Sequence, residues 1–191
     1  MLKYLFITLC IAFLACQNVS NNNVQSNNWS FKPQNNSPIL DKNAGVIILQ
    51  YQQLVMGFTN KDTVYIKEKC ADFIRLTDSL SVLNVIQDSN RQNLWKIGVL
   101  NINAELQGLN NTNLSNWEEL NATFNMCSIQ ILNLLGAIGY EQNNIYIFNS
   151  DMGQNQDAFY WFGLQKNGKD PYSANNRAKQ TLATQVLQET K

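Results

Sequence analysis

The segment from Ser115 to Gly139 constrains the fold most strongly, because it combines a helix start, an amphipathic pattern and a helix stop. Ser115 and Glu118 have the spacing of a capping box, which predicts that a helix begins there, and Gly139 predicts a left-handed end. The apolar residues between them recur at alternating spacings of four and three, which places them on one side of a helix. They are Leu120, Phe124, Cys127, Ile131 and Leu134. A helix with this face has to pack against other helices.

Three more amphipathic segments precede this helix, and polar stretches separate them. The first begins at about Pro38, Asp62 is a candidate N-cap for the second, and the break from Ser81 to Asn90 offers several caps for the third. Their apolar residues are, in order, Ile47, Tyr51, Leu54, Val55 and Phe58; Ile66, Cys70, Phe73, Ile74 and Leu80; and Leu94, Trp95, Ile97, Ile102, Leu106 and Leu109. Four such helices with short connections predict a mainly α fold, an antiparallel four-helix bundle.

After Gly139 the pattern changes from helical to extended. Tyr146 to Phe148 is a β-type run, Ser150 to Asp157 is a polar turn, and Ala158 to Phe162 is a second run rich in aromatic residues. These features predict a small C-terminal β-hairpin packed on the end of the bundle. The last stretch, Ala174 to Thr190, has the spacing of a marginal helix.

Residues 1–15 have the features of an export signal. Lys3 supplies a positive charge, and the apolar run from Leu5 to Leu14 is too short to span a membrane comfortably. The site Phe13-Leu14-Ala15-Cys16 resembles a bacterial lipobox, although the two residues before Ala15 depart from the commonest pattern. The segment therefore predicts a lipoprotein whose mature chain begins at a lipidated Cys16, with a plain secretory signal or an uncleaved anchor as the alternatives.

A lipid anchor at Cys16 would place the protein in the bacterial cell envelope. Gln17 is not the Asp that commonly retains lipoproteins at the inner membrane, so we expect the outer membrane, facing the periplasm. Residues 16–38 are rich in Asn without a periodic apolar pattern, which predicts a disordered tether. In this interpretation Trp29 and Phe31 are stray aromatic residues rather than docked ones. The folded domain then spans residues 39–191.

Composition argues against two classes of function. Fourteen basic and fourteen acidic residues give no net charge, and no basic stripe is visible, so nucleic acid is not an expected partner. Histidine is absent, which removes the commonest metal ligand and the usual general base near neutral pH. Glu118 and Glu119 are not a catalytic pair, because neighbours on a helix diverge. We therefore expect a protein that is not an enzyme, without catalytic residues or a bound cofactor.

A resemblance to a known family rests on residues spread along the chain. They are Tyr51, Glu119, Phe124, Ile145-Tyr146, Met152, Trp161 and Asp170-Pro171-Tyr172. Their order resembles that in a family of exported bacterial domains of unknown function associated with heavy-metal (copper) efflux adaptors. The specific part runs from Tyr146 to Tyr172, where the family has His-Cys-Pro-Met, Trp-x-Ser and Asn-Pro-Tyr-Tyr-Gly motifs. The resemblance implies a helical front part and a soft-metal site.

The departures from these motifs affect the metal chemistry. Asn149-Ser150-Asp151-Met152 stands where the family has His-Cys-Pro-Met, Ala174 stands for the motif's Gly, and no Cys follows Cys127. If the family's Cys, His and Met residues bind copper, only Met152 carries over as a metal ligand. One thioether is a weak site, since selection of Cu(I) normally needs several soft ligands. The sequence thus predicts a degenerate metal site.

The two cysteines of the helical region allow three interpretations. Cys70 and Cys127 fall on apolar helical faces, where a free Cys is most often a small buried hydrophobic residue. A disulfide formed in an oxidising envelope and metal ligation are the alternatives. Met126 adds no ligand beside Cys127, because adjacent helical residues point about 100° apart. A working copper site would use Met152 with Asp151 or with the two cysteines.

Aromatic residues are concentrated in the C-terminal quarter of the chain. They are Tyr146, Phe148, Phe159, Tyr160, Trp161, Phe162 and Tyr172. The favoured interpretation is that they cover the core of the bundle; the alternative is an exposed surface for an envelope protein partner, with Tyr146, Trp161 and Tyr172. The sequence as a whole favours a non-catalytic accessory or binding lipoprotein related to periplasmic heavy-metal-handling proteins. The alternatives are a functional copper-binding protein and a structural lipoprotein unrelated to metals.

Overall fold

The computed structural model describes residues 29, 31, 34–84, 86–150, 159–172, 180–182 and 185–186. Within these ranges the chain is mainly helical with a small antiparallel sheet, which confirms the expected fold class at that level. The helices are α2 (Pro38–Asn60), α3 (Thr63–Ser81), α4 (Ser89–Asn111) and α5 (Trp117–Ile138). None of the helices in the described part has the length and apolar character needed to cross a bilayer.

Short polar side chains determine where three of the helices begin. The Ser37 hydroxyl accepts a hydrogen bond from the Leu40 N–H, and Pro38 follows it at the first helical position of α2. The expected cap Asp62 is confirmed, and of the several candidates before α4 the cap is Asp88. Each carboxylate accepts a hydrogen bond from the backbone N–H three residues later. These caps separate α2, α3 and α4 at the polar breaks of the sequence.

The predicted start of α5 is wrong by one residue. Asn116, not Ser115, is the N-cap: its side-chain oxygen accepts from the Glu119 N–H, and its amide donates to the Glu119 carboxylate 3.0 Å away. The Ser115 hydroxyl instead bonds the side chain of Asn113. Both residues can cap a helix, and Asn116 has an acidic residue three positions later that completes a reciprocal pair. The left-handed end at Gly139 is confirmed, with φ of 63°.

The apolar faces of the helices form one core, with two exceptions in α4. Leu94 and Ile97 are 47% and 55% exposed, contrary to the prediction. The buried face of α4 consists of Trp95, Val99, Ile102, Leu106 and Leu109. This set keeps the alternating spacing of four and three, and a residue one or two positions away from it is rotated off the face.

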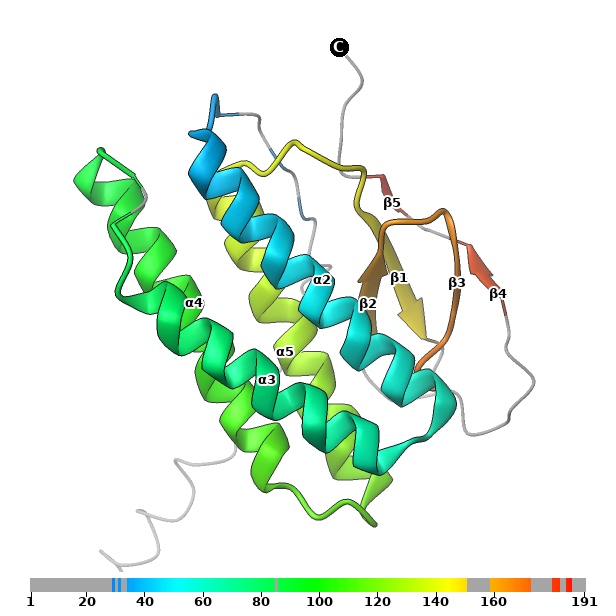
Figure 1. Cartoon of the computed structure of the whole chain (residues 1–191). Helices are drawn as coiled ribbons and strands as arrows, with labels where there is room; N and C mark the ends of the chain where they lie inside the picture. Colours follow the sequence, from blue (N-terminus) through cyan, green and yellow to red (C-terminus); the bar gives the residue numbers. More distant parts are fainter. Residues whose placement is uncertain are drawn as a thin grey trace, which may run out of the picture.

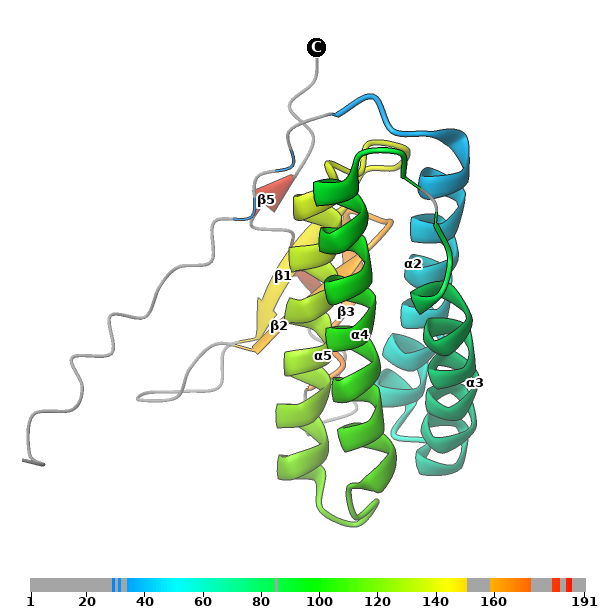
Figure 2. The same cartoon turned by 90° about the vertical axis from the view of Figure 1, so that its left-hand side faces the viewer.

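The four helices lie side by side, and the sheet lies on the flank formed by α2 and α5, away from α3 and α4 (Figures 1 and 2). Each helix packs against the next in the chain, whereas α2 and α5 contact each other much less. The predicted hairpin is confirmed as β1 (Tyr146–Ser150) and β2 (Phe159–Gly163), paired antiparallel with Phe148 opposite Trp161. Its predicted position on the end of the bundle is wrong. The hairpin packs instead along the flank, with β2 against α5.

The end of the chain is extended where it is described. Strand β3 (Asn167–Lys169) pairs with β4 (Gln180–Leu182), and β5 (Gln185–Val186) pairs with β1. The marginal helix expected from Ala174 to Thr190 is therefore wrong at these residues. Backbone pairing with strands that are already in place overrides a weak helical pattern.

The two aromatic residues of the expected tether are docked. Trp29 and Phe31 are only 7% and 6% exposed. The indole N–H of Trp29 donates to Asn133 of α5 over 3.0 Å, and its ring packs edge-on against Tyr160 of β2 at 5.1 Å. The interpretation of these residues as stray aromatics is thus wrong. Residues 1–28, which include the predicted signal and Cys16, lie outside the described residues.

Candidate functional site

Strand β2 forms one edge of the three-stranded sheet, whose order is β2-β1-β5. Its backbone groups at Tyr160 and Phe162 point away from β1, toward the helices. The Tyr160 N–H donates to the side-chain oxygen of Asn125 in α5 over 2.7 Å, and the Phe162 N–H donates to the Tyr51 hydroxyl in α2 over 3.4 Å. Side chains of two helices thus act as the missing neighbouring strand for these donors.

The carbonyls on the same edge are also satisfied. The amide of Gln52 donates to the Phe162 carbonyl over 3.1 Å, and the hydroxyl of Tyr172 donates to the Tyr160 carbonyl over 2.8 Å. An edge strand with its backbone groups occupied cannot accept a further strand from a partner. This edge of the sheet is an internal junction and not a docking site.

Two buried hydroxyls lie at the centre of this junction. The oxygens of Tyr51 and Ser128 are 2.8 Å apart, and the Ser128 hydroxyl also reaches the Phe124 carbonyl of its own helix at 2.9 Å. Burial raises the pKa of Tyr51, and the hydrogen bond to Ser128 opposes this rise only in part. Burial also raises the pKa of Tyr172 well above its ordinary value. Both phenols therefore stay neutral and serve as hydrogen-bonding groups.

Stacked rings surround the hydroxyls. The ring of Tyr51 stacks on Phe162 with centroids 4.0 Å apart and faces Phe124 at 5.6 Å. Tyr172 lies 5.6 Å from Phe124 on another side. Tyr51, Phe124 and Tyr172 are three of the residues on which the family resemblance rests, and the fold brings them together in one cluster. Their role in the described structure is to hold the sheet against α2 and α5.

The turn that contains Tyr172 is fixed to the end of α2. The Lys61 ammonium donates to the Pro171 carbonyl over 2.9 Å and lies 4.7 Å from the centre of the Trp117 ring. Desolvation lowers the pKa of Lys61, and the nearby Asp170 carboxylate partly offsets this shift. A half-buried cation with these partners positions the turn between α2 and α5.

A cavity of about 560 Å³ lies between α2 and the β2–β3 turn. It is lined by Gln52, Val55, Thr59, Phe148, Trp161, Gly163, Leu164, Gln165, Asn167, Gly168 and Lys169. Among these described lining residues, Lys169 is the one charged side chain and none is acidic. Sequence reasoning missed this site, because its polar members come from a helix and from a turn whose relative positions depend on the whole junction.

The floor of the cavity is an aromatic pair. Phe148 and Trp161 are opposite each other across β1 and β2, and their rings stack at 4.1 Å. A Cβ atom on Gly168 would lie 2.2 Å from Cη2 of Trp161, so the turn packs directly on the indole. The indole nitrogen of Trp161 is buried and has no hydrogen-bond partner. The cavity therefore borders the Trp161 ring, whose nitrogen is buried away from solvent.

The residues predicted as an exposed partner surface are mostly buried. Trp161 and Tyr172 are 2% and 4% exposed, and Tyr146 is half-buried at the start of β1. The exposed-surface interpretation is thus wrong for Trp161 and Tyr172. The favoured interpretation, that the aromatic residues cover the core, is confirmed for both of them and for Phe148 and Phe162.

The structure leaves the predicted soft-metal site at Met152 untested. Met152 and Asp151 lie outside the described residues. Ser150, at the position of the family's Cys, donates its hydroxyl hydrogen to Asp170, whose carboxylate also accepts the Tyr172 N–H over 2.9 Å. In the described ranges no three or more His, Cys, Asp or Glu side chains form a group able to hold a metal. An engaged hydroxyl and a carboxylate are hard oxygen groups, which do not fit Cu(I).

Cys70 and Cys127 are both buried and unpaired. The Cys70 thiol donates to the Leu106 carbonyl over 3.1 Å, and burial raises its pKa to about 12. Burial raises the pKa of Cys127 as well. Met126 is 42% exposed while Cys127 is fully buried, which confirms that these neighbours point apart. A neutral, buried thiol is a poor metal ligand and a poor nucleophile.

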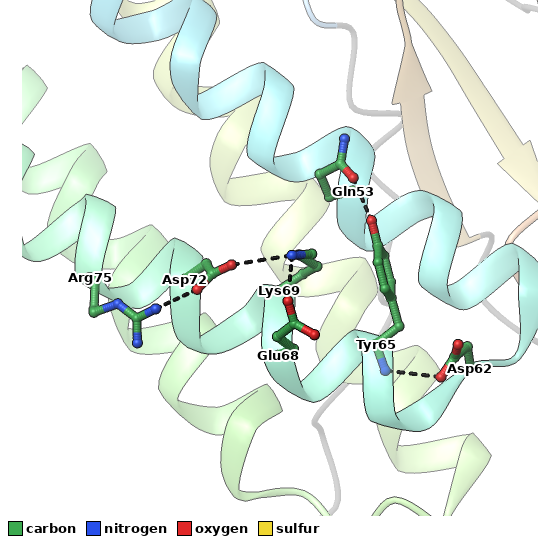
Figure 3. A network of polar contacts seen from close by, with 7 residues as sticks. All are labelled: Gln53, Asp62, Tyr65, Glu68, Lys69, Asp72 and Arg75. Carbon is green, nitrogen blue, oxygen red and sulfur yellow. Dashed lines mark hydrogen bonds and ion pairs between the residues drawn. The ribbon is translucent and has the colours of Figure 1, made fainter.

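The polar network on α2 and α3 is a surface feature (Figure 3). Lys69 pairs with Glu68 and Asp72 on α3, and Asp72 also pairs with Arg75. The hydrogen bond that the Lys69 ammonium donates to the Glu68 carboxylate is the main cause that raises the pKa of Lys69. The Tyr65 hydroxyl reaches across to Gln53 of α2. Ion pairs between partly or fully exposed side chains of this kind contribute little to stability.

Comparison with known proteins gives no further assignment: no family model matches the chain, and neither the curated proteins nor the solved structures contain a match.

Proposed function

We propose that this chain is a non-catalytic lipoprotein of the bacterial cell envelope that serves as an accessory or binding domain. In this proposal Cys16 carries the lipid anchor at the outer membrane, and the domain faces the periplasm. The helices form an antiparallel four-helix bundle, which the short connections and the packing of each helix on the next support. The sheet then adds a binding wall to the flank of the bundle.

The cavity between α2 and the β2–β3 turn carries the binding role. Its volume of about 560 Å³ lies in the usual range for small-ligand pockets, and its walls come from a helix and a sheet that four side chains hold in register. A preformed wall of this kind loses little conformational freedom on binding. No partner strand is needed to complete it.

The absence of catalysis is supported by the chemistry of the candidate nucleophiles. The chain has no histidine, so a hydroxyl or thiol nucleophile would need another base. Burial raises the pKa of Cys70, Cys127, Tyr51 and Tyr172, which leaves each of them protonated at neutral pH. Ser150 is buried and bonded to Asp170 without an imidazole between them.

The relation to heavy-metal-handling proteins is a proposal about architecture and not about metal binding. The residues that carry the resemblance and are described, such as Tyr51, Phe124 and Tyr172, meet in a packing cluster. At the family's ligand positions, Asn149 and Ser150 offer oxygen and nitrogen groups of low affinity for soft metals. A domain that kept the fold of this family and lost its metal ligands would have these properties.

A Cu(I) titration against a competing chelator, on the full chain under reducing conditions, tests the degenerate metal site. We expect the chelator to retain the copper at one equivalent of protein, and Met152→Ala to behave like the unchanged chain. Tight one-to-one binding that Met152→Ala abolishes would establish the chain as a copper-binding protein and overturn this part of the proposal.

The anchor is tested separately by fractionating cells that express the chain or its Cys16→Ser variant. We expect the unchanged chain in the membrane fraction and the variant in the soluble fraction. A Cys16→Ser variant that stays in the membrane fraction would show that the lipobox interpretation is wrong. Cys10→Ser, which changes a Cys inside the apolar run of the signal, is the matched control and should leave membrane attachment unchanged.

A further inference from the structure

We infer that the cavity between α2 and the β2–β3 turn binds a small organic acid, a carboxylate with a compact apolar body. This inference rests on the proposed binding role and specifies its ligand. It concerns the described lining residues around Lys169, Trp161 and Val55.

The charge of the lining selects an anion. Lys169 contributes a positive charge, and none of the other described lining side chains is charged. The nearest acidic residue in sequence, Asp170, is turned to Ser150 and to the Tyr172 N–H and is not part of the lining. Lys166 is exposed in the same turn and adds to the positive field without lining the cavity. A carboxylate is therefore favoured over an amine of the same shape.

Hydrogen-bond donors and apolar walls specify the rest of the ligand. The side-chain amides of Gln165 and Asn167 supply hydrogen-bond donors at the rim, and the ring of Trp161 lines the cavity while its indole nitrogen is buried. Val55 and Leu164 give the cavity an apolar wall. Carboxylate oxygens match the donors, and an aromatic or branched aliphatic body matches the wall.

Trp161 differs from another buried tryptophan, Trp95, in lining the cavity. Trp95 also has a buried indole nitrogen without a partner, but it lies in the helical core and borders none of the described cavities. Trp95 therefore provides an internal control for any effect that a ligand has on Trp161.

Benzoate is a suitable probe, with benzamide and benzylamine as neutral and cationic analogues of the same shape. The full chain, labelled with nitrogen-15 at the tryptophan indole position and held in detergent micelles, has four tryptophans and so gives four indole signals. Each signal is assigned by a Trp→Phe substitution. Titration with each probe then shows which indole signal shifts, and the dependence of the shift on probe concentration gives the dissociation constant.

We expect benzoate to shift the Trp161 signal and to leave the Trp95 signal in place. Lys169→Gln should weaken benzoate binding by about threefold, the size expected for a partly exposed ion pair. Lys166→Gln is the matched control, because this neighbouring lysine lies outside the lining, and it should change the dissociation constant much less. Benzamide should bind the unchanged chain more weakly than benzoate does. Lys169→Gln should leave the dissociation constant of benzamide unchanged.

Three results would overturn the inference: no response of Trp161 to benzoate, equal losses in the two lysine variants, or tighter binding of benzylamine than of benzoate. If benzamide or benzylamine shifts Trp161 as strongly as benzoate does, the cavity binds ligands and only the preference for an acid fails. If none of the three probes moves Trp161, the binding role proposed for this cavity fails as well.

Discussion

The hydroxyl of Tyr51 lies 2.8 Å from the hydroxyl of Ser128, so α2 and α5 are joined by a buried hydrogen bond on the flank where the sheet packs. The same phenol oxygen accepts the Phe162 N–H, and its ring stacks on Phe162. One side chain thus links two helices and a strand. Because these groups are buried, removing the hydroxyl leaves the Phe162 N–H without this acceptor and Ser128 with only its bond to the Phe124 carbonyl.

Tyr51→Phe should destabilise the protein by about 1–3 kcal/mol, because the ring stays in place while the Ser128 hydroxyl and the Phe162 N–H lose a buried partner. Urea unfolding followed by circular dichroism measures this difference. Tyr65→Phe is the control, since its hydroxyl bonds Gln53 in a partly exposed position, and it should cost less than about 0.5 kcal/mol. Equal losses of unfolding free energy in the two variants would show that the buried hydrogen bonds of Tyr51 stabilise the protein no more than the partly exposed hydrogen bond of Tyr65.

The contact between Trp29 and Asn133 should behave as a coupled pair. Trp29→Phe keeps an aromatic ring against Tyr160 and removes the indole N–H, at an expected cost of about 1 kcal/mol. In the Asn133→Ala background the same change should cost almost nothing, which gives a coupling energy of about 1 kcal/mol in a double-mutant cycle. Additive effects of the two substitutions would mean that the N-terminal segment is held by ring packing alone.

The helices were predictable because the apolar spacing and the capping residues that define a helix lie within or next to that helix. Alternating apolar spacing in a helix identifies the buried face wherever it occurs, and it placed Phe58, Phe73 and Phe124 in the core correctly. It failed at Leu94 and Ile97, because Leu94, Trp95, Ile97, Val99 and Leu100 follow one another closely in α4 and the spacing leaves more than one choice of face. The cap of α5 failed for a similar reason, since Ser115 and Asn116 are both competent.

The junction and the cavity were not predictable, because they depend on distant parts of the chain. Gln52 and Asn125 are polar residues on helices, and nothing in their surroundings indicates that their partners are backbone groups of β2. Trp29 fell in a polar stretch whose composition predicts disorder, and its docking depends on Asn133 and Tyr160. The aromatic runs near the C-terminus did predict the hairpin. Its position on the flank depends on how α2 and α5 are arranged, which is not encoded in the hairpin sequence.

Gly168→Ala should destabilise the protein by about 1–3 kcal/mol, because the new Cβ would lie 2.2 Å from the Trp161 ring and the β3 turn would have to move. Gly108→Ala is the matched control. Its Cβ would meet Thr123 at an ordinary 3.6 Å inside α4, so it should stabilise the helix by about 0.5–1 kcal/mol. Thermal unfolding of both variants gives the comparison. A neutral Gly168→Ala would contradict the close packing of the turn on the indole.

Stability should fall at alkaline pH because burial raises the pKa of the Cys70 thiol from 9.0 to about 12. Below pH 9 the thiol is protonated in both the folded and the unfolded chain, so it adds no pH dependence. Between about pH 9 and 12 the unfolded chain loses this proton and the folded chain retains it, which lowers the free energy of unfolding by up to about 1.4 kcal/mol per pH unit. Urea unfolding at pH 8, 9 and 10 measures the slope. Cys70→Ala removes this contribution and should make the slope between pH 9 and 10 shallower. Some slope remains, because burial also raises the pKa of Cys127, Tyr51 and Tyr172, which lose protons in the unfolded chain over the same range. An unchanged slope in Cys70→Ala would mean that the Cys70 thiol ionises in the folded state.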